Sequence, residues 1–308
     1  RNKAGCIQIS SVLRTAYESL EERAKNNGEV TGIATGYIGL DRMTSGLHAD
    51  ELIILAARPS VGKTAFVLNI AKNVAVNLNE TVAIFSLEMG AESLVERIIC
   101  SHASINAGHL KTGKLTPEEY TQYFVATGAL SEAPIFIDDT PGIRVAEIRA
   151  KCRRLKQERN NLGLIVIDYL QLIEGNGKES RQQEVSEISR NLKKLAKELK
   201  VPVIALSQLS RGVEQRQDKR PIMSDIRESG SIEQDADIVA FLYRDDYYRQ
   251  EPDENGHVPE VEPNSTIEVI IEKNRSGPRG TVELNFMKEF NKFTNLVPDG
   301  VEQNAPMA

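Results

Sequence analysis

Short apolar runs alternate with helical segments through the middle of the chain. The runs cover residues 51–57, 81–86, 134–138, 163–168, 201–206 and 236–243. They are rich in branched side chains, as expected of strands that are buried on both faces of a sheet. Between them, apolar side chains recur every three or four residues, for example from Val145 and from Val185, which is helical spacing. The alternation predicts an α/β fold whose mostly parallel sheet carries helices on both faces.

The two ends of the chain depart from this alternation. Residues 10–27 carry apolar side chains at helical spacing, so we expect a linker helix over 1–27, followed by one main domain over 28–308. Residues 266–272 and 280–286 flank a Gly/Pro/Arg turn, which predicts a C-terminal antiparallel hairpin at the sheet edge. The acidic stretch 245–265 lacks periodicity and is expected to be a mobile insertion. The chain opens with Arg1, so we expect it to belong to a longer protein.

Composition excludes several classes of protein. The chain has 38 Lys and Arg against 44 Asp and Glu, a net charge of −6, so it cannot coat nucleic acid with its whole surface and any such site must be local. No run approaches the roughly 18 uninterrupted apolar residues of a membrane span, which predicts no membrane partner. The 3 cysteines are not closely paired, which argues against a disulfide framework or a zinc site and favours a cytoplasmic location.

The clearest functional motif is a phosphate-binding loop. Residues 57–64 read Ala-Arg-Pro-Ser-Val-Gly-Lys-Thr between a predicted strand and a predicted helix, which is the Walker A arrangement with Ala57 in place of the first glycine. In such a loop the backbone N–H groups surround a phosphate chain at a helix N-terminus. Lys63 is expected to reach the β- and γ-phosphates and Thr64 to bind Mg²⁺, so ATP and Mg²⁺ are the predicted cofactors. The other predicted nucleotide contacts are Ser60, Val61, Gly62 and Ala65.

Three further polar side chains follow apolar runs, where ligands collect in open α/β sheets. Asp168 ends the run 163–168 and is a candidate Walker B aspartate that holds Mg²⁺ through Thr64 and water. Glu88 is a candidate to activate the attacking water. Gln208 is a candidate sensor of the γ-phosphate. The simpler alternatives are a helix cap for Asp168 and a solvated glutamate for Glu88.

A long polar stretch over 210–237 separates two predicted strands. It carries five cations, namely Arg211, Arg216, Lys219, Arg220 and Arg227. Loops of this length in compact domains are usually functional or disordered. Few aromatic side chains occur here, which favours sequence-independent contact with phosphates over base stacking. A solvated flexible loop is the alternative. The basic helix 145–159 is more simply a solvated face than a second DNA surface.

Taken together, the motifs resemble those of the bacterial replicative DNA helicases of the DnaB family. The residues that carry the resemblance are 57–64, 86–89, 167–173, 206–211 and 225–237, which occur in the order found in the family. The resemblance extends from about residue 10 to residue 295. It implies a linker helix followed by a RecA-like motor domain, with the N-terminal domain of the family absent from this chain.

The resemblance implies an activity and a set of partners. The implied assembly is a homo-hexameric ring. Driven by ATP, it would move 5′ to 3′ on single-stranded DNA and unwind the duplex at the replication fork. A primase and a helicase loader are the further partners it implies.

The resemblance also implies roles for individual residues. Glu88 is the implied catalytic base, Gln208 couples nucleotide state to the DNA loops, and Arg97 is a cation beside the site. Arg275 is the implied arginine finger and Lys273 a second cation, both acting on the ATP of the neighbouring subunit. An arginine supplied in this way stabilises charge on the transferring phosphoryl group, and it requires a head-to-tail interface. The implied DNA contacts are Arg227 and backbone groups near Glu228 and Gly230.

Two other functions share parts of this pattern. A RecA-type recombinase would have the same phosphate loop and hairpin but would form an open filament. A DNA-independent ATPase scaffold would use the oligomer without binding DNA, although the Arg, Ser and Gly content of 210–237 speaks against it.

Overall fold

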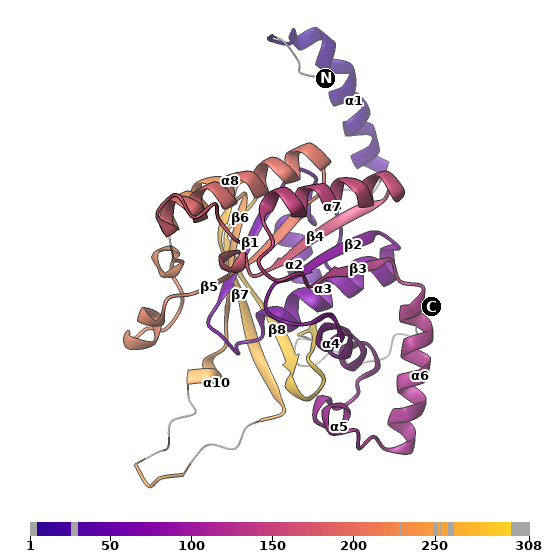
Figure 1. Ribbon diagram of the computed structural model, residues 1–308, viewed down its shortest axis with the longest axis vertical. Coiled ribbons are helices and arrows are strands. Elements are labelled where there is room, and N and C mark those ends of the chain that lie inside the picture. The colour runs from indigo at the N-terminus through magenta and orange to yellow at the C-terminus, as the bar shows by residue number, and fades with distance from the viewer. Residues whose placement is uncertain are drawn as a thin grey trace.

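The strands form one mixed sheet with helices on both of its faces (Figure 1). The computed structural model describes residues 5–25, 30–227, 229–248, 252, 254–257 and 262–296. Within these residues the nine-stranded sheet has the order β3-β2-β4-β5-β1-β6-β7-β8-β9. Strands β1 to β6 are parallel and β7 to β9 are antiparallel, which confirms the predicted fold class and the C-terminal hairpin.

The strand bounds follow the predicted runs closely. The strands are β1 (Leu52–Ala57), β2 (Thr81–Ser86), β3 (Ile135–Asp138), β4 (Leu162–Asp168), β5 (Val203–Gln208), β6 (Ile238–Tyr243), β7 (Asn264–Asn274), β8 (Gly280–Met287) and β9 (Lys292–Asn295). The predicted run 201–206 is shifted by two residues, because Pro202 has no N–H to donate to the ladder. Gln208 is the last residue of β5 and lies opposite Ala57 at the end of β1.

Helices connect the strands and cover the sheet. The α-helices are α1 (Ile9–Lys25), α2 (Ile38–Thr44), α3 (Lys63–Leu78), α4 (Ala91–Ala103), α5 (Ala107–Thr112), α6 (Pro117–Ser131), α7 (Val145–Glu158), α8 (Arg181–Leu199), α9 (Ser229–Asp235) and α10 (Asp245–Tyr248). Short 3₁₀ turns are η1 (Leu170–Leu172), η2 (Arg211–Gln215), η3 (Met223–Asp225) and η4 (Lys288–Phe290). Along β1, Ile53 and Leu55 pack in the core that α3 covers, whereas Leu52 and Ile54 pack in the core under α7 and α8.

Two segments have more structure than the sequence predicts. The stretch 210–237 contains η2, η3 and α9, although α9 has a single large apolar side chain, Ile232, which is fully buried. Strand β9 is also new, because its four residues are too short for a pattern to appear. Phe293 of β9 stacks on Phe286 at 4.3 Å between ring centroids and meets Phe66 of α3 edge-on at 5.2 Å.

The predicted linker helix corresponds to α1. Residues 1–4 and 26–27 of the predicted range 1–27 lie outside the described residues. Every residue of α1 is exposed, including the apolar side chains of Val12, Leu13, Tyr17 and Leu20. Among the described residues, no helix combines the length and apolarity needed to cross a membrane.

The acidic stretch 245–265 lies partly outside the described residues, and its first part has a defined structure. Residues 245–248 form α10. Asp246 accepts a hydrogen bond from Ser265 at 2.5 Å and forms an ion pair with Lys288. These residues therefore have regular structure that the lack of periodicity did not predict, and Asp246 fastens them to β7 and to the turn after β8.

The basic side chains of α7 are largely used within the fold. Arg149 and Arg153 pair with Glu198 of α8, and Lys151 pairs with Asp138 at the end of β3. These ion pairs favour the simpler interpretation of the helix, a solvated face that contributes to packing.

The ring cluster around β9 gives a stability prediction. Phe293→Ala should lower the free energy of unfolding by about 3–5 kcal/mol, because Phe293 is buried against Phe286 and Phe66. Phe124→Ala, at an exposed ring of α6, is the matched control and should change it by less than about 0.5 kcal/mol. Urea unfolding measures both, and equal midpoints for the two variants would contradict the packing assigned to β9.

Candidate active site

The phosphate loop joins the end of β1 to the start of α3. Gly62 precedes the first turn of α3 with φ 120°, a conformation that side chains rarely allow. A Cβ at this position would also come within 3.2 Å of the Phe286 ring. The glycine therefore serves both the turn and the close approach of β8 to the loop.

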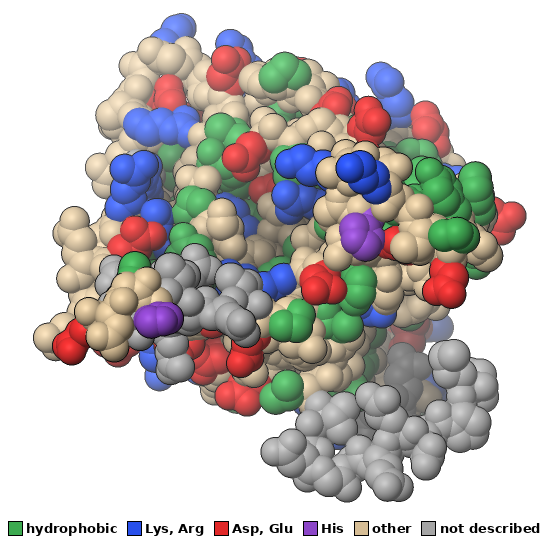
Figure 2. Space-filling view, turned by 90° about the horizontal axis from the view of Figure 1, so that it is seen from below, with side chains coloured by type: hydrophobic (Ala, Val, Ile, Leu, Met, Phe, Trp, Pro, Cys, Tyr) green, Lys and Arg blue, Asp and Glu red, His purple; other side chains and the backbone are tan. Residues whose placement is uncertain are grey.

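A recess of about 470 Å³ opens beside the loop at the carboxyl ends of the parallel strands. Figure 2 views this end of the molecule, which is hollowed near its middle with Lys and Arg side chains at the edge of the hollow. Predicted residues that line the recess are Ser60, Gly62, Lys63, Thr64, Ala65, Glu88, Arg97 and Gln208. The structure thus brings together residues from the phosphate loop, the end of β2, α4 and β5 that are far apart in the sequence.

Two predicted residues lie behind the lining. Val61 is 1% exposed and packs in the core, so its side chain does not face a ligand. Asp168 is buried at the end of β4, where its Oδ2 accepts a hydrogen bond from the Thr64 hydroxyl at 3.0 Å. This contact joins the two residues that were predicted to hold the metal.

Two buried polar atoms of the site are left without a hydrogen bond from any described residue. They are Nζ of Lys63 and Oδ1 of Asp168. Nζ of Lys63 lies 4.7 Å from the centroid of the Tyr169 ring. A buried ammonium and a buried carboxylate oxygen with free hydrogen-bonding capacity are costly unless a partner satisfies them. A phosphate chain and a divalent cation supply such partners, so the residues present fit ATP with Mg²⁺.

Burial shifts the pKa values of Lys63 and Asp168 in the directions that favour their neutral forms. The pKa of Lys63 is lowered to about 8, mainly by burial and further by Arg58, whereas Asp168 and Glu88 oppose the shift. The pKa of Asp168 is raised by burial, and Lys63 and the Thr64 hydroxyl oppose the increase. The site therefore favours a ligand that brings negative charge to Lys63 and positive charge to Asp168.

Several residues that contribute to this site were given no role in the sequence analysis. Arg58 is buried and donates to the Leu209 carbonyl and to Glu214, both at 2.9 Å, which ties the loop to the segment after β5. Arg244 is buried between the rings of Tyr247 and Phe286 and donates to the Val61 carbonyl at 3.4 Å. The unpredicted residues of the lining are Pro59, Met89, Phe286 and Asn291.

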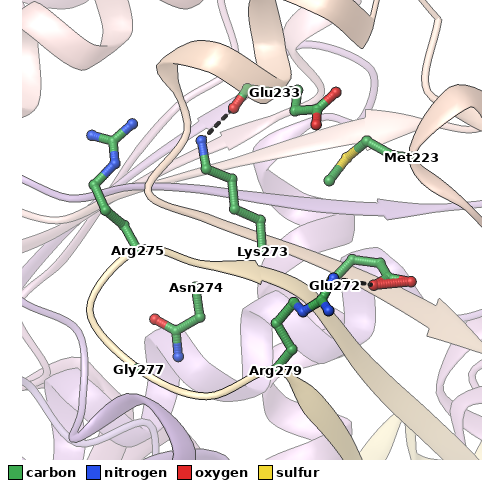
Figure 3. A pocket seen from close by; sticks show the side chains of 8 residues that line it. All are labelled: Met223, Glu233, Glu272, Lys273, Asn274, Arg275, Gly277 and Arg279. Atoms are coloured by element: carbon green, nitrogen blue, oxygen red, sulfur yellow. Dashed lines mark hydrogen bonds and ion pairs between the residues drawn. The ribbon is translucent and has the colours of Figure 1, made fainter.

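Lys273 and Arg275 lie at the opposite end of the parallel strands from the phosphate loop. Strand β7 runs antiparallel to β6, with Lys273 opposite Val239 and Asn274 opposite Ile238, so its carboxyl end lies at the amino ends of the parallel strands. A second recess of about 710 Å³ opens there (Figure 3). Its lining is Met223, Glu233, Glu272, Lys273, Asn274, Arg275, Gly277 and Arg279. The structure does not bring the two predicted trans-acting cations to the nucleotide recess of their own chain.

Comparison with known proteins decides the family. Residues 32–295 match the model of the DnaB-like helicase C-terminal domain. This chain belongs to that family. The match confirms the resemblance drawn from the motifs, and the remaining comparisons agree with it.

Two curated relatives of this DnaB-family chain are replicative helicases. The chain is 65% identical over 299 residues to replicative DNA helicase DnaB of Geobacillus stearothermophilus, covering 96% of this chain and 64% of the relative. It is 63% identical over 298 residues to replicative DNA helicase DnaC of Bacillus subtilis (strain 168), covering 96% and 63%. The chain therefore spans just under two thirds of the length of these relatives.

Solved structures share both the fold and much of the sequence. A solved ATPase domain superposes with a TM-score of 0.86 at 45% identity, covering 95% of this chain and 100% of that one. A structure of a DnaB-like replicative helicase, described together with its interactions with primase, superposes with a TM-score of 0.83 at 44% identity, covering 96% and 69%. These neighbours confirm the RecA-like core.

The predicted DNA segment of this DnaB-family domain leads into α9. Arg227 is exposed, Gly230 is exposed in the first turn of α9, and Glu228 lies outside the described residues. Ile226, the residue before Arg227, forms an isolated antiparallel bridge with Leu209, which directly follows β5. The predicted segment therefore adjoins the carboxyl end of β5, where Gln208 lies.

Other cations of the same stretch are committed to the fold. Arg216 forms paired hydrogen bonds with Asp225, and Arg220 donates to both carboxylate oxygens of Glu268 on β7. They hold the stretch in place rather than leaving it a solvated loop. Arg227 stays a predicted DNA contact.

The lowered pKa of Lys63 gives a pH prediction. Because Lys63 is protonated below about pH 8 and neutral above it, affinity for a non-hydrolysable ATP analogue should fall between about pH 7.5 and about pH 9.5, by at most about tenfold per pH unit. Lys63→Arg keeps its charge and should flatten the profile. Titration with a fluorescent analogue measures both, and a flat profile for the unaltered chain would refute the role of Lys63.

Proposed function

We propose that this chain is the motor of an ATP-driven replicative DNA helicase. In this proposal a homo-hexameric ring hydrolyses Mg-ATP at its subunit interfaces, moves 5′ to 3′ on single-stranded DNA and unwinds the duplex at the fork. The sequence predicts a linker helix over 1–27 and a motor domain over 28–308. Membership of the DnaB-like helicase family and the names of the relatives support the proposal.

The observation that carries the proposal is the separation of the two cationic sites. The phosphate loop lies at the carboxyl ends of the parallel strands, and Arg275 lies at their amino ends. A cation that is to act on phosphate from this position must act on another copy of the chain. Two different surfaces that meet head to tail generate rings when the rotation closes. The exposed apolar side chains of α1 support a further contact with the neighbouring subunit.

The residues of the recess have distinct roles in the proposed hydrolysis. Lys63 and the loop backbone hold the β- and γ-phosphates, with Arg97 as an additional cation beside them. Glu88 accepts the proton of the attacking water. Gln208, at the end of β5, contacts the γ-phosphate and relays its presence to the segment that follows. Arg275 and Lys273 of the neighbouring subunit donate to the charge that develops on the transferring phosphoryl group.

Mg²⁺ would be held by Thr64, with Asp168 behind it. When bound, the ion neutralises charge on the phosphates. The hydrogen bond from Thr64 to Asp168 fixes the direction of the hydroxyl, so Asp168 would support the ion through Thr64 and water.

The DNA would pass along the start of α9. Arg227 and the backbone near Glu228 and Gly230 contact its phosphates, which suits a motor that must pass any sequence. We also propose a primase and a helicase loader as partners. The primase is supported by the structural neighbour that is described with its interactions with primase. A cytoplasmic location fits the free thiols of Cys100 and Cys152.

Unwinding of a forked duplex tests the proposed activity. With ATP and Mg²⁺, the chain should unwind a substrate with a 5′ tail and fail on one with only a 3′ tail, and Lys63→Ala should be inactive on both. Strand exchange in place of unwinding would favour the recombinase. Turnover that ignores single-stranded DNA would favour the scaffold.

Arg227 gives the test of the DNA path. Arg227→Ala should weaken binding to poly(dT) and reduce the slope of log affinity against log salt by about one for each subunit in contact, because one phosphate contact is lost. Arg154→Ala, at an exposed position on α7, is the matched control and should leave the slope unchanged. Fluorescence anisotropy at several salt concentrations measures the slope, and unchanged binding in Arg227→Ala would remove it from the path.

A further inference from the structure

Asp237 connects three separate parts of the fold through its side chain. It is 7% exposed and directly precedes β6. Its Oδ2 accepts hydrogen bonds from the Leu52 backbone N–H at 2.8 Å and from Nζ of Lys193 on α8 at 2.6 Å. Its Oδ1 accepts a hydrogen bond from the Arg275 guanidinium at 2.8 Å. One buried carboxylate therefore joins the start of β1, the outer helix α8 and the hairpin turn.

Arg275 is held at three points while its outer side remains free for a ligand. Its backbone N–H donates to the Asp237 carbonyl at 2.9 Å, and its guanidinium donates to Oδ1 of Asp237 and, at 3.1 Å, to the Gln234 carbonyl. A guanidinium has five N–H donors, so these contacts leave others available. The side chain is 48% exposed. The anchoring thus fixes the direction of the side chain without burying it.

The end of α9 supports the neighbouring cation in the same way. Nζ of Lys273 donates to the Glu233 carbonyl at 2.5 Å, one residue before the carbonyl that accepts from Arg275 (Figure 3). Helix α9 itself is fastened to α8, because Ser231 contacts Ser186 at 2.7 Å. Arg279, in the same turn, is by contrast 72% exposed and reaches Glu272 only at 4.0 Å. Of these three cations, Arg275 is the one whose side chain donates a hydrogen bond to a buried carboxylate, that of Asp237.

We propose that Asp237 is a positioning residue that aims Arg275 at the nucleotide of the neighbouring subunit. The inference rests on the proposed function, in which Arg275 acts in trans. Asp237 does not touch the nucleotide in this arrangement. A long side chain that is already fixed loses little freedom when it meets its phosphate, so the carboxylate contributes to the rate through orientation. Its bonds to β1 and α8 make the anchor rigid.

Subunit mixing separates this role from a structural one. Asp237→Asn keeps the size of the side chain, removes its charge, and should lower ATP turnover at least tenfold while ATP-analogue binding is retained. The Asp237→Asn subunit keeps an intact phosphate loop, whereas the Lys63→Ala subunit has an inactive phosphate loop and an intact Arg275. In a random equal mixture about one quarter of the interfaces combine the intact loop with the intact finger. Turnover should therefore rise well above the sum of the two variants measured separately.

Two reference mixtures make each outcome decisive. Arg275→Ala with Lys63→Ala should recover in the same way, and failure of this pair would overturn the trans role of Arg275 and the present proposal with it. Recovery of that pair without recovery of the Asp237 pair would overturn Asp237 alone, because its effect would then lie within its own subunit. The second reference mixture combines Asp41→Asn with Lys63→Ala. Asp41 is an equally buried carboxylate that accepts from Thr35, and this mixture should show no turnover above the sum of its two variants.

A second variant covers the case in which Asp237→Asn does not fold. Asp237→Glu keeps the charge and the Lys193 partner but moves the carboxylate by one methylene group. It should also lower turnover and recover on mixing with Lys63→Ala. Normal turnover in either folded variant would overturn the proposal.

Discussion

Strand β1 pairs in parallel with β5 on one side and β6 on the other, and the positions of the functional groups depend on this pairing. Its register places Ala57 opposite Gln208, and β4 in turn places Asp168 opposite Ser86. Polar residues that end separate strands therefore meet beside one loop. The strand is fully buried, so its position is held by the cores on both faces of the sheet.

Burial of charge is the second constraint, and it acts at both ends of the parallel strands. At the carboxyl edge, Lys63 and Asp168 are buried without full hydrogen bonding from the described residues, which prepares them for a ligand. At the amino edge, Asp237 is buried with both oxygens engaged, which prepares it to hold other groups in place. A carboxylate left unsatisfied suits binding, and one fully satisfied suits support.

The sequence predicts the parts of the site that are local or that follow a repeated pattern. The phosphate loop is contiguous, and Asp168 and Glu88 follow buried strands whose carboxyl ends must share an edge. Phe286 and Asn291 could not be found in this way, because they reach the recess only through the antiparallel pairing of β8 and the turn after it. The two-sided bonding of Asp237 depends on distances between elements that no spacing encodes. The polar helix α9 and the four-residue β9 carry too few apolar side chains for a period.

The phosphate loop and Arg275 lie at opposite ends of the parallel strands, and this placement determines how many complete catalytic sites an assembly contains. Under the proposed function, a lone chain has two half-sites and no complete one. An open row of subunits has one complete site fewer than it has subunits, whereas a closed ring has as many sites as subunits. Closure thus changes the catalytic capacity of the assembly without any change in a subunit, and turnover per chain reports directly on whether the assembly is closed.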